Sequence, residues 1–197
     1  RFMSSFQSML KETLFNLLNI YSPSGLESEL VRFVVDYFNQ LGLHPSNDAQ
    51  GNCYIFIPCD GEPVLLTAHL DAISNGIAPI PREEKGLIHA SNNAILGLDD
   101  KASVAVLLEV VKNLMKSGRR HRPIEILFTV QEEPGCVGVK YFLEHQSSPL
   151  KSKTGLCFDF PKPFGSILQR AAGIWRATIE FNGKAAHAAR PEMGCNA

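Results

Sequence analysis

Six residues that can bind metal or transfer protons lie just after short apolar runs or just before a predicted helix. They are His69, Asp71, Asp99, Glu132, Glu133 and Asp159. Imidazole and carboxylate groups together suit zinc, cobalt or manganese ions. Burying this many carboxylates without a cation would be very unfavourable, because each charge would lose its hydration. The six residues therefore predict a two-metal hydrolase site.

The spacing within this set indicates different roles for its members. A metal-bound imidazole usually donates its second N–H to a carboxylate, so Asp71 is expected to orient His69. Of the adjacent pair Glu132 and Glu133, one can bind a metal ion while the other takes a proton from a metal-bound water. Asp100 is explained equally well as a carboxylate that caps a helix.

The elements that must position these residues follow from apolar periodicity. Short, β-rich runs indicate strands at residues 53–57, 64–68, 124–130 and 155–158. Helical spacing marks residues 5–20, 26–41, 100–117 and 135–145. This order predicts an α/β fold in which helices flank a mixed, mostly parallel central sheet. Ligands bind outside the carboxyl ends of such strands, so the candidate residues should meet at one edge.

Two further patterns concern the ends of the second helix and the last part of the chain. Ser24 and Glu27 have the spacing of a capping box before the second helix, and Gly42 is a fitting stop for it. After about residue 169 the character changes, and residues 175–183 alternate like a half-exposed strand. This change predicts the start of a second domain.

Composition narrows the class of protein. The chain is 45% hydrophobic and 20% charged with a net charge of -1, which predicts neither a nucleic-acid nor a membrane partner. No apolar run approaches the roughly 20 residues of a membrane-spanning helix. The five cysteines are scattered without a C-x-x-C motif, which is typical of free thiols in the cytoplasm. A thiol nucleophile is the alternative, but no local signature supports it.

Five motifs occur in a fixed order along the chain. They are His69-Leu70-Asp71, Gly97-Leu98-Asp99-Asp100-Lys101, Gln131-Glu132-Glu133, Asp159 and Gly183-Lys184-Ala185-Ala186-His187-Ala188. Together they resemble the aminoacylase/carboxypeptidase/peptidase T family of co-catalytic zinc peptidases. The most similar subgroup is the peptidase T-like tripeptidases, on the segments Ser22-Pro23-Ser24-Gly25, Ala94-Ile95-Leu96-Gly97 and Thr129-Val130-Gln131. Any single motif is weak, whereas five in order with compatible spacing are specific.

The resemblance implies the fold of a zinc peptidase and a set of metal ligands. His69 and Asp159 would hold one metal ion, Asp99 would bridge both ions, and Glu133 would hold the second. The implied ions are two divalent cations, zinc first, with cobalt or manganese as alternatives. Lys101 lies inside a motif but has no implied contact with metal.

The resemblance also implies the reaction and its partners. Glu132 would be the general base that activates a metal-bridging hydroxide for hydrolysis of a peptide bond near the N-terminus of small peptides. Asp71 would orient His69. His187 matches a lid histidine that, in dimers of this family, reaches into the partner's site and stabilises the oxyanion. Residues 1–168 would form most of a catalytic domain, and residues 169–197 would begin an α+β lid or dimerisation domain. A homodimer through this lid domain is the implied assembly.

The main departure from the family pattern is length. The pattern continues beyond His187 and supplies a last metal-ligand histidine that this sequence does not contain. The second metal site would therefore lack its terminal ligand, and we expect the 197-residue chain alone to be poorly active.

Three rival functions stay open. An amidohydrolase that deacylates N-acyl amino acids would use the same motifs. A truncated, non-catalytic remnant could persist as a metal-binding or interaction domain, although the intact Glu132–Glu133 pair argues against it. A Rossmann-type dehydrogenase is disfavoured, because no G-x-G-x-x-G follows the early strands.

Overall fold

A five-stranded mixed sheet lies at the centre of the first of two units, Arg1–Pro161 and Lys162–Ala197. The computed structural model describes residues 2–145, 150–159, 165–173, 175 and 177–195. The two units are described separately. The assignment of residues 1–168 to a catalytic domain and of residues 169–197 to a lid or dimerisation domain stays a prediction.

The strands of the sheet run in the order β1-β2-β6-β3-β7. Their bounds are Ser46–Asn47 (β1), Cys53–Ile57 (β2), Val64–His69 (β3), Ile124–Thr129 (β6) and Gly155–Cys157 (β7). Strand β3 pairs parallel with both β6 and β7, whereas β2 runs antiparallel to β6 and to β1. Only β2 therefore points the opposite way, which confirms the mixed, mostly parallel sheet.

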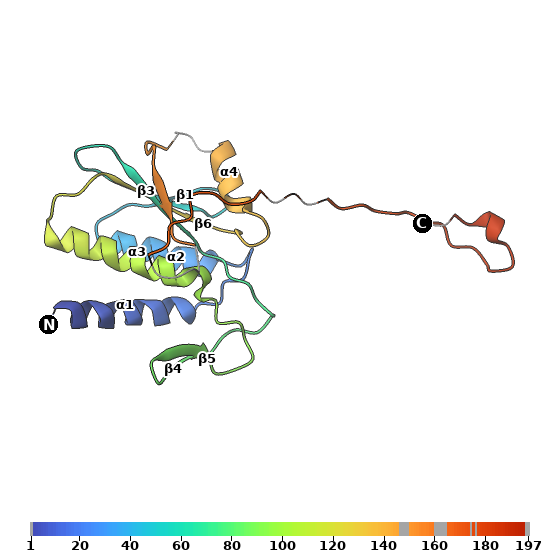
Figure 1. Ribbon diagram of the computed structural model, residues 1–197, viewed down its shortest axis with the longest axis horizontal. Helices are drawn as coiled ribbons and strands as arrows, with labels where there is room; N and C mark the ends of the chain where they lie inside the picture. Colours follow the sequence, from blue (N-terminus) through green and yellow to red (C-terminus); the bar gives the residue numbers. More distant parts are fainter. Residues whose placement is uncertain (1, 146–149, 160–164, 174, 176, 196–197) are drawn as a thin grey trace. The chain divides into compact units, whose positions relative to one another are not determined.

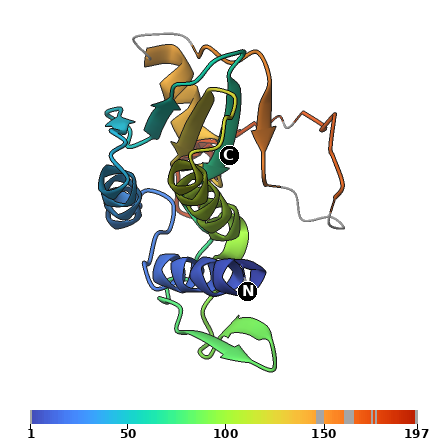
Figure 2. The same cartoon turned by 90° about the vertical axis from the view of Figure 1, so that its left-hand side faces the viewer.

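Four helices flank this sheet. They are α1 (Phe2–Leu18), α2 (Ser28–Gln40), α3 (Leu98–Ser117) and α4 (Val137–His145). Helices α2 and α3 lie on one side of the sheet with α1 packed beyond α3, and α4 lies on the other side (Figures 1 and 2). Each helix was predicted from its apolar periodicity, and all four are present within a few residues of the expected bounds.

The core lies between the sheet and helices α2 and α3. In β2, Cys53, Ile55 and Ile57 alternate toward this core and are at most 1% exposed. From the helix side, Phe38 packs on Phe128 of β6 with ring centroids 6.2 Å apart. Burying such side chains drives the helices onto the sheet and leaves the strand ends rigidly placed.

A β-hairpin that the sequence did not predict lies outside the sheet (Figure 1). Its strands are β4 (Pro81–Glu84) and β5 (Leu87–Ala90), joined through Lys85 and Gly86 at positive φ. Two central residues at positive φ are typical of a tight hairpin turn. The hairpin escapes prediction because β4 is Pro-Arg-Glu-Glu, which lacks the apolar alternation of a half-buried strand.

The predicted capping box at Ser24 and Glu27 is wrong. Helix α2 begins at Ser28, and Glu27 occupies its N-cap position without a side-chain capping bond. The Ser24 hydroxyl instead donates to Oδ2 of Asp71 at 2.6 Å. A hydroxyl that donates to a buried, ionised carboxylate makes a stronger hydrogen bond than one that accepts a backbone N–H, so the tertiary contact replaces the local one. Gly42, at φ 75°, follows the helix as expected.

The second unit contains less regular structure than expected. Its described residues form a 3₁₀ turn, Pro191–Met193, and one antiparallel bridge between Lys184 and Cys195. The strand expected at 175–183 is absent from the described residues 175 and 177–183. A strand needs a neighbour to accept its backbone hydrogen bonds, and here pairing is limited to that bridge. In the described parts of the chain, no helix is long and apolar enough to cross a membrane.

Candidate metal centre

The candidate residues meet at the carboxyl edge of the parallel strands. His69 is the last residue of β3 and pairs with Thr129, the last residue of β6. Strand β7 ends at Cys157, two residues before Asp159. Because these three strands are parallel, their carboxyl ends lie together, as the sequence predicted.

His69 lies at the centre of the cluster. Its Nε2 is 3.3 Å from Oδ1 of Asp99 and 3.9 Å from Oδ2 of Asp159. One potential ligand atom from each of these three residues lies within 4.8 Å of the others. The imidazole is buried and 3% exposed, whereas the Asp99 carboxylate is 67% exposed. The group is therefore anchored on its histidine side and open on its aspartate side.

A second group shares the same histidine. Ligand atoms of His69, Glu132 and Glu133 also lie within 4.8 Å of one another. The structure thus brings five of the six predicted residues into one overlapping cluster. The individual roles assigned to these residues stay predictions.

Asp71, the sixth residue, contacts the imidazole through two atoms. His69 Nδ1 lies 2.9 Å from the Asp71 backbone oxygen and 3.4 Å from its Oδ1. Burial alone would lower the pKa of His69, but Asp71, Asp100 and Asp159 outweigh it and raise the pKa to about 9. A bound metal ion would have to displace the Nε2 proton, so metal binding here is coupled to proton release.

The Asp71 carboxylate also holds the segment that carries the two glutamates. Its Oδ1 accepts a hydrogen bond from the Glu132 N–H at 2.8 Å, and its Oδ2 accepts one from the Glu133 N–H at 3.1 Å. Burial would raise the pKa of Asp71, but hydrogen bonds from His69, Ser24 and these two amides lower it to about 2. Asp71 is therefore ionised at neutral pH.

Asp99 and Asp100 sit at the start of α3 and face different surroundings. Gly97, at φ 74°, precedes them, and a Cβ atom there would lie 3.1 Å from the Cβ of Ala72. The peptide bond between Asp99 and Asp100 is cis. Asp100 is 3% exposed, and its Oδ2 lies 3.4 Å from the His69 backbone nitrogen, which donates to it. Burial raises the pKa of Asp100 to about 6.

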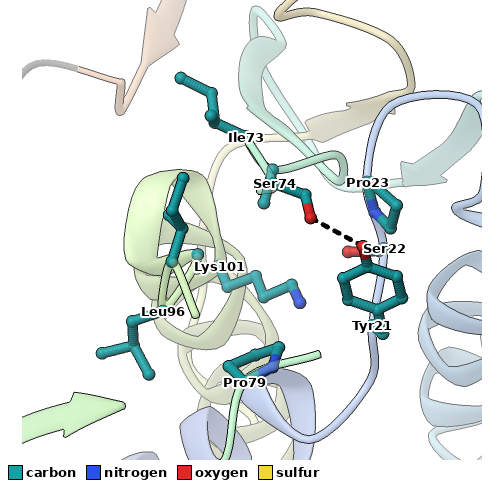
Figure 3. A pocket seen from close by; sticks show the side chains of 11 residues that line it. Tyr21, Ser22, Pro23, Ile73, Ser74, Pro79, Leu96 and Lys101 are labelled. Carbon is teal, nitrogen blue, oxygen red and sulfur yellow. Dashed lines mark hydrogen bonds between the residues drawn. The ribbon is translucent and has the colours of Figure 1, made fainter. Parts of the chain in front are cut away.

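Lys101 faces away from the cluster. It is 1% exposed, and its ammonium donates to the backbone oxygen of Ile20 at 2.6 Å. Figure 3 shows its side chain reaching toward the segment around Tyr21 and Ser22, where Tyr21 and Ser74 share a 2.7 Å hydrogen bond. Burial lowers the pKa of Lys101 to about 8.

Within the first unit, the other histidines do not belong to the groups of candidate ligands. His187 lies exposed in the second unit, where its Nδ1 accepts a hydrogen bond from the Ala189 N–H at 3.2 Å. Its proposed contact with a partner's site stays a prediction. Ring nitrogens of His89, His121 and His145 lie within hydrogen-bond distance of nearby backbone oxygens.

Several residues around the glutamates were missed by sequence reasoning. Glu27 and Asn52 bind backbone amides just before Glu132, and the thiol of Cys136 donates to Glu132 Oε1 at 3.4 Å. Glu27 had a local explanation as a helix cap, and Asn52 lay outside every motif. Their contacts link segments far apart in the chain, so spacing gave no signal.

The electrostatics of the cluster fit a divalent cation. Burial and the nearby Asp99 carboxylate raise the pKa of Asp159. Burial, together with the carboxylates of Asp99 and Glu132, raises the pKa of Glu133. A cation held among these oxygens and the His69 imidazole would offset both effects. The donor set of nitrogen and oxygen atoms suits zinc, cobalt or manganese.

Fold and site together define a metallopeptidase-like α/β protein. The profile of peptidase family M28 matches residues 57–164, more than half of the chain. The chain therefore belongs to peptidase family M28.

Solved structures confirm the predicted likeness to peptidase T. Aminopeptidase PepT from Bacillus cereus superposes with a TM-score of 0.74 and 26% identity, covering 95% of this chain and 53% of that protein. A tripeptidase from Staphylococcus aureus gives a TM-score of 0.70 and 26% identity, covering 95% and 52%. An uncharacterized Bacillus subtilis protein, YqjE, is 28% identical over 204 residues, covering 97% and 54%. The chain thus spans about half the length of these relatives.

Proposed function

We propose that the protein is a metal-dependent peptidase that hydrolyses a peptide bond near the N-terminus of small peptides, as an aminopeptidase or tripeptidase. One observation carries the proposal. The carboxyl edge of β3, β6 and β7 gathers His69, Asp99, Asp159, Glu132 and Glu133 within reach of common ligand positions. The likeness to PepT and to a tripeptidase supports this substrate class.

The geometry supports the first part of the ligand assignment, and the resemblance to the family supplies the second. His69, Asp99 and Asp159 would hold one ion, and Asp99 with Glu133 would contribute to a second, with zinc as the proposed metal. When bound, the metal supplies Lewis-acid polarisation and lowers the pKa of water. Burial of the imidazole at 3% exposure fixes the one nitrogen ligand before any ion binds.

Glu132 is the proposed general base. Its backbone is fixed by the 2.8 Å bond to Asp71, and its carboxylate lies with His69 and Glu133 in one group of candidate ligands. From this place the carboxylate accepts a proton from the attacking water and delivers it to the leaving amine nitrogen. Glu132 differs from Glu133 in this scheme, because Glu133 is assigned to the metal.

The experiment is a matched set of variants of the complete protein. Glu132→Ala should retain metal, measured by elemental analysis, and lose hydrolysis of tripeptides by at least about 100-fold. Glu144→Ala, an exposed glutamate of α4, is the control and should behave as wild type. Comparing free-amine tripeptides with N-acetyl amino acids separates a peptidase from an amidohydrolase. Full turnover in Glu132→Ala, or a preference for N-acetyl substrates, would overturn the proposal.

The assembly and compartment belong to the same proposal. We infer a cytoplasmic homodimer formed through residues 169–197, on the resemblance to peptidase T-like enzymes. Light scattering on the complete protein tests the dimer, and a monomer at all concentrations would contradict it.

A further inference from the structure

Four successive backbone N–H groups at the end of β6 donate to side chains from elsewhere in the chain. The amides of residues 130 and 131 donate to Asn52 Oδ1 and Glu27 Oε1, at 3.1 and 3.0 Å. Those of residues 132 and 133 donate to the two carboxylate oxygens of Asp71, at 2.8 and 3.1 Å. The segment 130–133, which carries both glutamates of the site, is thus held residue by residue.

The carbonyl side of the same segment is also occupied. The backbone oxygens of residues 130, 131 and 132 accept N–H groups from the turn at residues 135–138, at 2.7–3.1 Å. The N–H groups of segment 130–133 therefore bind side-chain acceptors, and its carbonyl oxygens at residues 130–132 bind backbone donors. Its conformation is set by these partners rather than by pairing with a neighbouring strand.

The side chains that hold the amides are themselves buried and fixed. Glu27, Asn52 and Asp71 are 5%, 1% and 0% exposed. Asn52 Nδ2 donates to Asp48 at 2.6 Å and to the Gly138 backbone oxygen at 2.9 Å. Rigid, buried partners transmit position to the groups that they hold, whereas exposed and mobile partners do not.

Glu27 acts at the point where the backbone changes direction. Gln131 lies at φ 51°, in the left-handed region, which is unfavourable for a residue with a β-carbon. The Gln131 N–H is the group that Glu27 accepts. The same Oε1 accepts the Gly25 N–H at 2.9 Å, which ties this carboxylate to its own turn.

A capping role does not explain this carboxylate. Glu27 occupies the N-cap position of α2, yet it makes no side-chain bond to the first turn of that helix. A buried carboxylate that neglects its own helix and binds a distant strained residue has a different function. Glu27 does not belong to either group of candidate ligands, so its influence on the site must pass through the backbone.

We propose that Glu27 is a positioning residue for Glu132 and Glu133, which acts by holding the Gln131 amide. The roles of the two glutamates rest on the proposed function, whereas the anchoring of the segment does not. Asn52 and Asp71 hold the residues on either side, so removing Glu27 should loosen the segment rather than release it.

The test compares variants of the complete protein with a matched control. Glu27→Ala removes the acceptor, Glu27→Asp withdraws it by one methylene, and Glu27→Gln keeps a neutral acceptor oxygen of the same reach. Glu29→Ala, an exposed glutamate two residues away, is the control. Three quantities are measured: amide hydrogen exchange at residues 131–133, Co²⁺ affinity by absorbance titration, and kcat and KM for a tripeptide.

In Glu27→Ala we expect faster exchange at residues 131–133, together with a 10- to 100-fold loss in Co²⁺ affinity or kcat and little change in KM. Glu27→Asp should show smaller losses of the same kind. Glu27→Gln should stay within about 3-fold of wild type, because it keeps the acceptor. If Glu27→Ala does not fold, the Asp and Gln variants make the same comparison.

Two outcomes would overturn the proposal. The first is unchanged exchange at residues 131–133 in Glu27→Ala or Glu27→Asp. The second is faster exchange with both Co²⁺ affinity and kcat unaltered. A wild-type protein without peptidase activity would instead overturn the proposed function, and exchange and Co²⁺ affinity would still decide the role of Glu27.

Discussion

The imidazole Nδ1 of His69 lies closer to the backbone oxygen of Asp71, at 2.9 Å, than to its carboxylate Oδ1, at 3.4 Å. The orientation of the ring therefore depends mainly on the main chain at residue 71. Besides its contact with the imidazole, the Asp71 carboxylate is the acceptor for two backbone amides and for the Ser24 hydroxyl. Its principal structural task is to hold the neighbouring glutamate segment.

The variant Asp71→Asn tests whether the backbone oxygen orients His69 while the carboxylate holds the glutamate segment. An amide group at residue 71 leaves the backbone oxygen in place but cannot accept all the hydrogen bonds that the carboxylate accepts. We expect Zn²⁺ affinity to fall by less than about 10-fold and kcat for a tripeptide to fall by about 10- to 100-fold. Asp60→Asn, at a side chain 93% exposed, is the control. A larger loss in affinity than in kcat would show that the carboxylate serves His69 instead.

Sequence reasoning succeeded where local pattern and fold rule agreed. The apolar runs of β3 and β6 predicted buried strands, and the rule for parallel strand ends then placed His69, Glu132 and Glu133 together. It failed where one pattern has two explanations. Ser24 and Glu27 satisfy the spacing of a capping box, but their partners lie at Asp71 and Gln131.

Sequence reasoning missed the hairpin and wrongly predicted the strand of the second unit for related reasons. Residues 81–84 carry no apolar alternation, so nothing local marks them as a strand, yet they pair with residues 87–90. Residues 175–183 do alternate, but a strand exists only beside a partner. Pairing is a non-local property, and neither case is decided by the residues of the segment alone.

The left-handed conformation of Gln131 predicts different effects on stability for two substitutions. At φ 51° a β-branched side chain is strongly disfavoured, so Gln131→Val should lower the free energy of unfolding by about 1–2 kcal/mol. Gln131→Gly removes the steric penalty, and its effect should stay within about 1 kcal/mol of wild type. Urea denaturation measured by circular dichroism compares the two. Equal stability of both variants would show that the conformation carries no strain.

The cysteines should differ in their rate of alkylation. Cys59 is exposed, whereas burial and the Glu132 carboxylate raise the pKa of Cys136, and burial raises that of Cys53 to about 12. Because only the thiolate reacts, iodoacetamide should modify Cys59 first, Cys136 later and Cys53 last in the native protein. Peptide mass spectrometry over a time course gives the order. Early labelling of Cys136 would place its thiol outside the contact with Glu132.

The buried carboxylate of Glu109 predicts a loss of stability in acid. Its Oε1 accepts hydrogen bonds from Thr13, Tyr37 and Lys112, at 2.7, 2.8 and 3.1 Å. Burial alone would raise the pKa of Glu109, but these bonds outweigh it and hold the pKa below the usual 4.5. Since the folded pKa is lowered, the stabilisation is complete above pH 4.5 and is lost as the pH falls through the folded value.

We therefore expect Glu109→Gln to reduce stability at neutral pH by about 1–3 kcal/mol and to flatten the decline below pH 4.5. Glu12→Gln, at an exposed site, should leave both unchanged. Urea titrations at several pH values measure the effect by circular dichroism, because the single tryptophan, Trp175, lies in the second unit. A parallel decline in wild type and Glu109→Gln would exclude Glu109 as its cause.

The repulsion within the metal centre predicts that one ligand variant stabilises the metal-free protein. Burial and the Asp99 carboxylate raise the pKa of Asp159, so its ionisation in the folded state is unfavourable. A raised folded pKa means that stability is lost as the pH rises through that value. Asp159→Asn removes this charge while keeping the shape of the side chain. Without metal at neutral pH, the variant should have a higher melting temperature than wild type.

Metal should reverse that order. At Zn²⁺ concentrations about 100 times the wild-type Kd, binding stabilises the wild type by about 2.7 kcal/mol, whereas Asp159→Asn should gain much less. The crossing of the two melting temperatures between chelator and Zn²⁺ is the decisive observation, because a structural defect would lower both values. If Asp159→Asn gains as much from Zn²⁺ as the wild type does, Asp159 is not a ligand, and the ion would have to be held by His69 with Glu132 and Glu133.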